Sequence, residues 1–383
     1  MKYIKTIILA IFLLYTTSAY AVEIQQYQFE CDYTITDTFF TSNYKFLIGG
    51  VENDPNTIRF SEFLNQYRTN AMHDDTEYNF QTFISCYNKS GDIEWKSVIP
   101  TENKDIQVVT NISELGTNAF LICVQKLFDF SQTKFYVLDK FGNISRPTGL
   151  LNDILGEARI WSDKGYVLSQ SLANPKVVSL YSYKKEALSE IWSINNGELN
   201  FTWGDNVVFT DKGVLIAGQK FMDEAYVSYA KYAYFVDLNG IIQWRYDGND
   251  SNCKFTSCYI DNNKVFLFDK YGFNEGEKTV LDINDGTLIE KKEFHHKISD
   301  ACYIFDKNGD KIEILFLKKD GNSMISYYDG NELQKINIHM CDYLEMYRDC
   351  PNMMKVSDSE VIVIYSEQYE YDVDTVMCIC ISY

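Results

Sequence analysis

The sequence predicts an all-β chain folded as a seven-bladed β-propeller of four-stranded antiparallel blades. Three observations predict this fold: a recurring turn-and-strand unit, a second turn in phase with it, and chain ends that complement each other. The composition agrees, because aromatic residues make up 15% of the chain and only 5 prolines occur. Aromatic side chains suit pleated, half-buried strands, whereas proline interrupts them.

A tight polar turn followed by an apolar run recurs at nearly constant spacing. Asp163-Lys164-Gly165 precedes the run 166–168, and Asp211-Lys212-Gly213 precedes the run 214–216. A period near 50 residues, built only of strands and turns, is typical of propeller blades. The equivalent turn position falls at Asn118, Lys164, Lys212, Asn262, Gly309 and Ser359, at intervals of 46, 48, 50, 47 and 50 residues.

A second turn, of the form Asp-x-x-Gly, accompanies the first in most repeats. Asp and Asn stabilise such turns by bonding to their own backbone, and Gly supplies the positive φ that other residues avoid. Each repeat then holds two hairpins, so four strands, which we name A to D from the inside of the ring outward. The glycines expected to hold a positive φ in these C–D turns are Gly91, Gly142, Gly240, Gly286 and Gly330.

The two ends of the chain predict how the ring closes. The seventh repeat supplies strands A, B and C and then stops at Tyr383 without a D strand. The segment Glu23 to Phe29 alternates apolar and polar residues, as the D strands of other repeats do. We therefore expect the N-terminal strand to complete the last blade, which would cover two otherwise open strand edges.

The motif Asp-x-x-Gly-x-x-x-Trp carries a family resemblance. It occurs at Asn88 to Trp95, with Asn in the leading place, and at Asp237 to Trp244. Trp192 keeps the tryptophan without the glycine, while the turns that begin at Asp282 and Asp329 keep the glycine alone. The pattern resembles the repeat of the quinoprotein-like (PQQ-like repeat) β-propellers, which include quinone-dependent dehydrogenases and the propeller lipoprotein of the bacterial outer-membrane assembly machinery. The resemblance implies architecture rather than activity.

The first residues form a secretory signal peptide, predicted to span 1–21. Lys2 and Lys5 precede an apolar stretch too short to span a membrane, and Ala19-Tyr20-Ala21 supplies small residues for cleavage. No cysteine lies at the cleavage point, so no lipid anchor is expected. The mature domain, 22–383, is predicted to be secreted or periplasmic, without membrane insertion.

Charge limits the partners of this domain. The chain carries 35 basic and 54 acidic residues, and removal of the two leader lysines brings the net charge from −19 to −21. A surface this acidic repels nucleic acid and anionic membranes. The composition therefore favours a protein or peptide partner, including a basic one, and excludes nucleic acid.

Sites of chemistry are few in this sequence. Only 4 histidines occur, and none lies in a recognisable catalytic or metal-binding motif. Quinone enzymes of the resembling family often hold the cofactor against an adjacent cysteine pair, and no Cys-Cys dipeptide is present here. The sequence therefore predicts no catalytic residue, no metal and no cofactor. Two pairs of cysteines flank short loops and are candidates for disulfides in an exported chain, namely Cys253 with Cys258 and Cys341 with Cys350.

Binding is expected on one face of the ring. The strand order places the A–B and C–D turns on one face and the B–C and D–A loops on the other, where the longer insertions gather. The largest insertion, 51–79, falls in the first blade. Exposed tyrosine offers contact area at low entropic cost. The candidates for this binding face are Tyr67, Arg68, Asp74, Asp75, Asp223, Glu224, Tyr226, Tyr271, Phe273, Tyr343, Tyr347, Tyr369 and Tyr371.

The sequence thus favours a non-enzymatic scaffold that grips a protein or peptide through its long loops. Two alternatives stay open at this stage. One is an enzyme of quinoprotein-like or hydrolase type with its site in the axial channel, and the other is a glycan-binding propeller.

Overall fold

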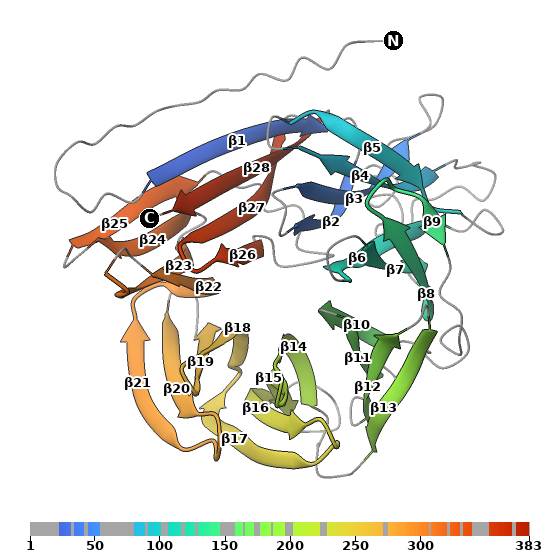
Figure 1. Ribbon diagram of the computed structural model, residues 1–383. Coiled ribbons are helices and arrows are strands. Elements are labelled where there is room, and N and C mark those ends of the chain that lie inside the picture. Colours follow the sequence, from blue (N-terminus) through green and yellow to red (C-terminus); the bar gives the residue numbers. More distant parts are fainter. Residues whose placement is uncertain are drawn as a thin grey trace.

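Seven four-stranded antiparallel sheets surround a common centre (Figure 1). They are seen in a computed structural model. No helix occurs within the residues it describes, which are 23–31, 34–41, 45–53, 80–88, 91–100, 106–115, 119–126, 129–145, 158–163, 165–171, 177–184, 187–195, 202–222, 228–270, 275–305, 308–319, 322–329, 332–338, 352–369 and 373–382.

The first four sheets follow the chain from the inner strand A to the outer strand D. Sheet 1 holds β2 (Thr34–Phe40), β3 (Phe46–Asn53), β4 (Phe80–Tyr87) and β5 (Ile93–Val98). Sheet 2 holds β6 (Gln107–Glu114), β7 (Ala119–Lys126), β8 (Asp129–Asp139) and β9 (Ile144–Ser145). Sheet 3 holds β10 (Ala158–Asp163), β11 (Tyr166–Ser171), β12 (Val177–Lys184) and β13 (Ala187–Asn195). Sheet 4 holds β14 (Thr202–Phe209), β15 (Gly213–Phe221), β16 (Tyr229–Asp237) and β17 (Ile242–Ser251).

Two further sheets repeat this order and the seventh departs from it. Sheet 5 holds β18 (Lys254–Asp261), β19 (Lys264–Lys270), β20 (Gly276–Asp282) and β21 (Leu288–Phe294). Sheet 6 holds β22 (Lys297–Phe305), β23 (Lys311–Lys319), β24 (Asn322–Asp329) and β25 (Glu332–Ile338). Sheet 7 holds β26 (Asn352–Ser357), β27 (Glu360–Tyr369), β28 (Val373–Ser382) and β1 (Glu23–Cys31).

The outer strand of sheet 7 comes from the other end of the chain. β1 pairs antiparallel with β28 in a register that runs from Glu23 opposite Ser382 to Cys31 opposite Asp374. Figure 1 shows β1 along the outside of β28. The predicted terminal strand, Glu23 to Phe29, is therefore present and extends two residues further.

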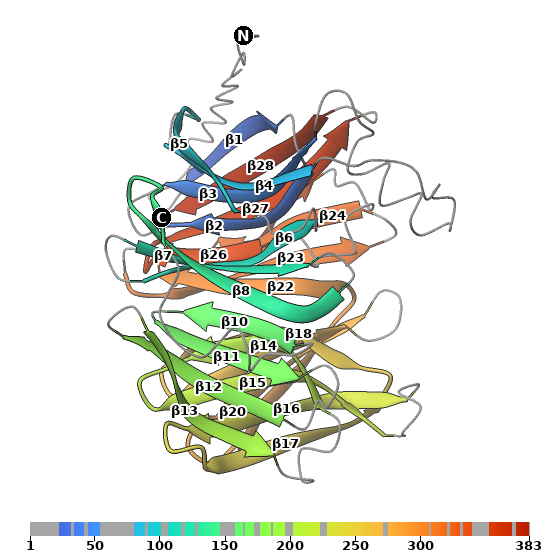
Figure 2. The same ribbon diagram turned by 90° about the vertical axis from the view of Figure 1, so that its right-hand side faces the viewer.

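The strands run across the thickness of the disc, as the side view of Figure 2 shows. Because sheets 1 to 6 have the same strand order, their A–B and C–D connections leave one face, which we call the short-turn face. The B–C and D–A connections leave the opposite, long-loop face. β3 extends to Asn53 and pairs there with Phe80 of β4, so the first insertion begins after 53 rather than at the predicted residue 51.

Sheets 2 to 6 each bury apolar side chains against both neighbouring sheets. In β7, Ile122 packs in a core with Leu47 and Ile84 of sheet 1, whereas the adjacent Leu121 packs with Val167 and Tyr181 of sheet 3. Successive residues of a strand point to opposite faces. An unbroken apolar run is therefore the pattern expected of a strand held between two neighbours.

The C–D turns adopt the predicted backbone. Gly91, Gly142, Gly240 and Gly286 have φ of 83°, 82°, 79° and 71°, which confirms the prediction for these positions. Gly330 lies outside the described residues. In sheet 4 the Asp237 carboxylate accepts bonds from the backbone N–H groups of residues 239 and 241, at 2.8 and 2.9 Å, which explains the leading Asp.

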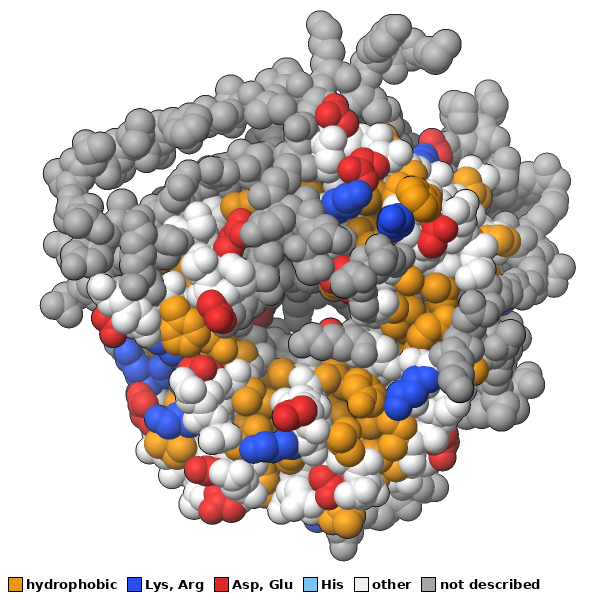
Figure 3. Space-filling view, in the orientation of Figure 1, with side chains coloured by type: hydrophobic (Ala, Val, Ile, Leu, Met, Phe, Trp, Pro, Cys, Tyr) orange, Lys and Arg blue, Asp and Glu red, His pale blue; other side chains and the backbone are white. Residues whose placement is uncertain are grey.

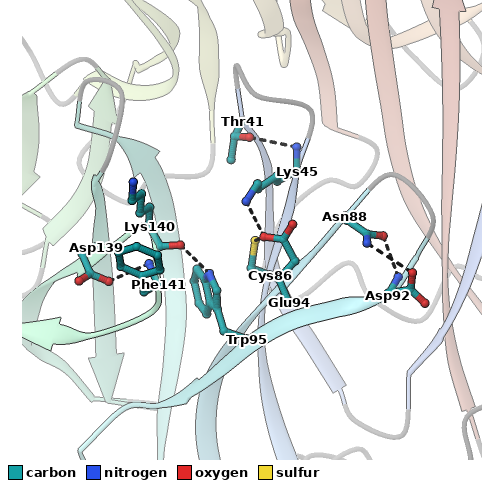
Figure 4. A network of polar contacts seen from close by, with 10 residues as sticks. All are labelled: Thr41, Lys45, Cys86, Asn88, Asp92, Glu94, Trp95, Asp139, Lys140 and Phe141. Carbon is teal, nitrogen blue, oxygen red and sulfur yellow. Dashed lines mark hydrogen bonds and ion pairs between the residues drawn. The ribbon is translucent and has the colours of Figure 1, made fainter.

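A tryptophan of strand D docks on the turn glycine of the next sheet. A β-carbon added at Gly240 would lie 2.9 Å from the Cβ of Trp192, and one at Gly286 would lie 2.8 Å from the indole of Trp244. Trp244 also donates its indole N–H to the carbonyl of Ile283 at 2.6 Å. The same contact joins Trp95 to the turn of sheet 2 (Figure 4), where the indole N–H reaches the Lys140 carbonyl at 3.0 Å.

A bulge in strand D aims each tryptophan at its neighbour. The pairing of strands C and D shifts by one residue directly before Trp95, Trp192 and Trp244. An extra residue at such a bulge turns the following side chain and increases the local twist. Trp192 and Trp244 are buried in this way, which makes these residues packing wedges between sheets.

A lysine clasp joins sheets 5 and 6 near the short-turn face. The Lys311 ammonium lies 3.6 Å from the ring centre of Phe266, 4.6 Å from that of Tyr259 and 4.5 Å from that of Tyr303, and pairs with Asp261 at 3.1 Å. Burial lowers the pKa of Lys311, although Asp261 opposes this effect. The clasp adds a cation–π contact to the apolar boundary between the two sheets.

We predict that Gly240→Ala destabilises the protein more than Gly309→Ala does. Both glycines hold a positive φ, so each substitution should cost about 1–3 kcal/mol of backbone strain. A β-carbon at Gly309 meets nothing within 4 Å, whereas one at Gly240 collides with Trp192, which should add about 1–3 kcal/mol. Chemical denaturation of the two variants measures the difference, and equal losses would contradict the docking contact.

Candidate functional site

The long-loop face gathers the connections in which binding was predicted. The strands on either side of four such connections end at this face: β3 and β4, β15 and β16, β19 and β20, and β27 and β28. A rigid scaffold that presents loops from adjacent strand ends is a common arrangement for binding sites. The described strand ends therefore define the base of the candidate site.

Most of the predicted binding residues lie outside the described residues. Tyr369 is the last residue of β27, so its backbone lies at the edge of this face. The other candidates, which stay predictions, are Tyr67, Arg68, Asp74, Asp75, Asp223, Glu224, Tyr226, Tyr271, Phe273, Tyr343, Tyr347 and Tyr371.

Local contacts hold together the two ends of the B–C connection of sheet 4, which joins β15 to β16. Met222 donates its backbone N–H to the carbonyl of Ser228 at 2.8 Å, and the rings of Phe221 and Tyr229 meet edge to face at 6.2 Å. Phe221 is buried, whereas the Met222 side chain is 64% exposed. Met222 therefore presents an apolar group at the foot of this connection.

A buried ionic cluster lies beneath the same face, between sheets 4 and 5. The Lys231 ammonium of β16 lies 2.6 Å from a carboxylate oxygen of Asp269 in β19 and 2.6 Å from one of Glu277 in β20. The side chains of Lys231 and Asp269 are only 2% and 1% exposed. Glu277 is also paired with Lys291 of β21 at 3.2 Å. We call these four residues the inter-sheet ionic cluster.

Two glycines make room for this cluster. A β-carbon at Gly248 would lie 2.2 Å from Cγ of Lys231, so only glycine lets the lysine stem pass between the sheets. A β-carbon at Gly276 would lie 2.9 Å from the Asp269 carbonyl and 2.8 Å from the His296 carbonyl. The backbone of neighbouring strands is thus fitted closely around the buried charges.

The buried environment moves the acid–base equilibria of the two carboxylates in opposite directions. Burial raises the pKa of Asp269 above its usual value, although Lys231 opposes this effect. Burial also acts to raise the pKa of Glu277, but hydrogen bonds from Lys231, Thr279 and Lys291 outweigh it and lower that pKa. The cluster therefore holds one carboxylate that gains a proton readily and one that resists it.

The sequence contains a signal for this cluster that composition alone does not show. Lys231 is the only charged residue within the otherwise apolar run from Tyr229 to Val236. A solvent-facing lysine would belong to an alternating pattern, so an isolated one in a two-sided apolar strand indicates a buried and paired charge. The partners could not be identified, because Asp269 and Glu277 lie 38 and 46 residues further along the chain.

The axis of the ring offers a second polar region. The inner strands of five sheets carry a β-bulge at a similar height, and a polar residue follows each bulge. We call this set the axial polar girdle. It consists of Asp37, Asn111, Asn206, Ser257 and Asp300.

Members of the axial polar girdle bond to neighbouring sheets. Ser162 of β10 donates to the Asn111 amide oxygen, and the Asn206 amide donates to the carbonyl of Phe255 at 3.2 Å. Ser257 donates to the Asp300 carboxylate at 2.6 Å. These bonds join adjacent inner strands, so they stabilise the ring around the hollow that Figure 3 shows at its centre.

The short-turn face carries smaller polar contacts. Figure 4 shows Lys45 paired with Glu94 at 2.5 Å, and the Asn88 side chain beside Asp92 within the first C–D turn. Burial raises the pKa of the neighbouring Cys86 thiol to about 12, so this thiol stays protonated at neutral pH. The contacts order the turns and leave no activated nucleophile at this position.

One of the two predicted disulfides is wrong. Cys258 lies inside β18 as a thiol, whereas Cys253 directly precedes that strand. Five residues of extended chain span about 15 Å, far beyond the roughly 7 Å that a disulfide permits. The sequence pattern failed here because the segment between the cysteines is a strand rather than a loop. The second predicted pair, Cys341 and Cys350, lies outside the described residues.

No group of three or more His, Cys, Asp or Glu side chains in the described part of the chain could hold a metal ion. No helix among the described residues is long and apolar enough to cross a membrane.

Solved structures share the propeller fold of this chain. It is similar to the polysaccharide lyase Uly1, with a TM-score of 0.55 and 7% identity over 91% of this chain and 90% of that one. It is similar to the Dos1 propeller, with a TM-score of 0.52 and 12% identity over 91% of this chain and 94% of that one. It is also similar to the Pan2 WD40 domain of Neurospora crassa, with a TM-score of 0.51 and 6% identity over 91% of this chain and 89% of that one.

These comparisons establish a β-propeller and no finer relationship. No family model matches the chain, and no curated protein matches it. The predicted propeller architecture is confirmed, while membership of the quinoprotein-like group stays a prediction. Identities this low show a shared fold, which hosts many unrelated functions.

We predict that Lys231→Met lowers the free energy of unfolding by about 3–5 kcal/mol, because it leaves the buried Asp269 carboxylate without its cation and removes one of the two cations paired with Glu277. The matched control is Lys220→Met, which removes a lysine paired with the largely exposed Asp247 and should cost at most about 1 kcal/mol. Urea denaturation at neutral pH compares the two. Equal losses would show that the buried cluster adds nothing beyond a surface ion pair.

Proposed function

We propose that this chain is a closed seven-bladed propeller that acts as a non-enzymatic scaffold and binds a protein or peptide on its long-loop face. The observation that carries this proposal is the face shared by the B–C connections, on which sheet 1 carries the connection 54–79. Bonds between the flanking strands close the bases of the sheet 4 and sheet 5 connections on the same face. A rigid base that carries a long connection favours recognition of a macromolecule over chemistry on a small one.

The proposed partner has a basic or mixed protein surface, because this chain is strongly acidic. The chain has a net charge of −19, and the proposed loss of a signal peptide spanning 1–21 would make it −21. Charge of this sign accelerates the approach of a basic partner and disfavours nucleic acid. We propose a secreted or periplasmic location on the basis of that leader sequence.

A second candidate function is an enzyme with its site at the axis. Two carboxylates of the axial polar girdle, Asp37 and Asp300, lie on inner strands, and a polysaccharide lyase shares the fold. Against this candidate, Asp300 is engaged with Ser257 of the neighbouring sheet. Activity that depends on these two carboxylates, without dependence on the long connections, would favour the enzyme.

We predict that replacing Tyr226, Tyr271 and Tyr369 together with Ala weakens capture of the partner about tenfold or more without unfolding the protein, because exposed aromatic rings supply much of the energy at interfaces. Affinity capture from the native envelope or culture fluid, followed by a binding titration, measures the loss. Higher salt should slow association.

The control for this experiment is Trp244→Ala, which should lower stability instead, because Trp244 is buried between sheets. Capture that is insensitive to the three tyrosines and to removal of the 54–79 segment would move the binding site to the short-turn face or the axis. That result would contradict the scaffold proposal in this form.

We predict that deletion of 22–30 destabilises the mature protein strongly, because it removes all of β1 except Cys31 and exposes the edge of β28. Thermal melting and light scattering should show an earlier transition with aggregation. The intact mature protein, 22–383, is the reference for both measurements. An unchanged melting temperature after loss of 22–30 would contradict ring closure by the terminal strand.

A further inference from the structure

Exposed apolar side chains gather at the short-turn face in the described part of the chain. Eight large apolar side chains are exposed there, and six of them lie in a C–D turn or near the start of a D strand. These six are Ile93, Phe141, Ile191, Ile241, Leu288 and Ile289. The other two, Val98 and Met222, lie at strand ends on the opposite face. Single exposed apolar residues are common on protein surfaces, so the shared location of the six is the informative feature.

The six residues border the contacts at which a tryptophan docks on a turn glycine. On the glycine side of each contact, an exposed apolar residue lies within two positions of the glycine. These pairs are Phe141 with Gly142, Ile241 with Gly240, and Leu288 with Gly286. Ile289 is the next residue of β21 after Leu288. Each docking glycine therefore has an exposed apolar neighbour along the chain.

The tryptophan side of two contacts carries a further exposed apolar residue. Ile93 lies two residues before Trp95, and Ile191 directly precedes Trp192. Figure 4 shows Trp95 and Phe141 on the two sides of the contact between sheets 1 and 2. We call the exposed apolar residues at the three contacts the rim patches: Ile93 and Phe141 for sheets 1 and 2, Ile191 and Ile241 for sheets 3 and 4, and Leu288 and Ile289 for sheets 4 and 5.

The docking contacts hold the rim patches in place. Beside Gly286, the Trp244 indole donates to the Ile283 carbonyl at 2.6 Å, and a β-carbon at Gly286 would collide with that indole. Side chains on a backbone fixed in this way lose little freedom when a partner binds. The rim patches are therefore ordered before binding, which favours affinity.

Carboxylates flank the rim patches. The three docking turns, 139–143, 237–241 and 282–287, carry four aspartates and one lysine, namely Asp139, Asp237, Asp282, Asp285 and Lys140. A hydrogen bond from the Asn143 side chain lowers the pKa of Asp139, and one from the Thr287 side chain lowers the pKa of Asp285. These two carboxylates are therefore charged at neutral pH. An apolar surface with carboxylates at its border matches a partner surface that mixes apolar and basic side chains.

We propose that the rim patches form a second docking surface, on the short-turn face, for a partner protein that presents Lys or Arg side chains among apolar ones. Apolar side chains of the partner cover the rim patches, and its cations meet the turn carboxylates. A second copy of this chain does not fit, because it would bring the same carboxylates against one another. The patches recur at three sheet boundaries, so one partner can engage more than one of them and gain affinity from the combination.

A fluorescently labelled peptide of alternating leucine and lysine is the probe for this surface. Added to the intact mature protein at physiological salt, it should bind saturably. Replacement of its leucines with serine, or of its lysines with glutamate, should weaken binding about tenfold or more, because each change removes one of the two matching features. Absence of saturable binding would overturn the proposal.

Two matched variants of the protein locate the probe. The triple variant Phe141→Ser, Ile241→Ser and Leu288→Ser removes one apolar side chain from each rim patch and should weaken binding about tenfold or more. Its melting temperature should stay nearly unchanged, because all three side chains are exposed. The control variant Val98→Ser with Met222→Ser removes exposed apolar side chains at the long-loop face and should bind the probe as the unmodified protein does.

Equal binding by the two variants would show that net charge alone holds the probe, and this result would also overturn the proposal. If the triple variant does not fold, hydrogen exchange of the unmodified protein decides. The probe should then increase the protection of the Ile241 amide in the C–D turn of sheet 4 and leave that of the Met222 amide at the opposite face unchanged. Because the two faces are opposite, each can bind its own partner whether or not the other does.

Discussion

Burial on both faces is the constraint on which this structure depends. Sheets 2 to 6 carry apolar side chains on both sides, so each is stable only between two neighbours, as Leu121 and Ile122 of β7 illustrate by packing in opposite directions. Such a sheet cannot end a row without exposing a whole face to water. A ring-like arrangement gives sheets a neighbour on each side, and the pairing of β1 with β28 joins the two ends of the chain in one sheet.

Directional contacts refine this apolar packing. The tryptophans of strand D fix the angle between neighbouring sheets, because the indole of Trp244 fits against Gly286 and bonds to the Ile283 carbonyl. On the inner strands, bulges and polar side chains join adjacent sheets around the axis. The apolar cores supply most of the stabilisation, whereas these contacts select one geometry among many of similar burial.

The long-loop face combines rigidity with buried charge. Lys231 is almost fully buried and has its partners in the next sheet, so the boundary between sheets 4 and 5 depends on an electrostatic contact as well as on packing. A buried ion pair contributes less to stability than apolar residues of the same size would, because desolvation offsets the attraction. Its presence under the proposed binding face is therefore better explained by the positioning of adjacent strands than by stability alone.

The sequence by itself determined the repeat, the four-strand unit and the terminal strand, because turn chemistry and two-residue alternation are local properties. The positive φ at Gly142 and Gly240 followed from the Asp-x-x-Gly pattern, since only the local backbone matters there. Tertiary structure alone decided which side chains meet. Asp269 and Lys231 are 38 residues apart, and no local pattern pairs them. The incorrect disulfide at Cys258 has the same cause, because the distance between two cysteines depends on whether the chain between them is a strand or a loop.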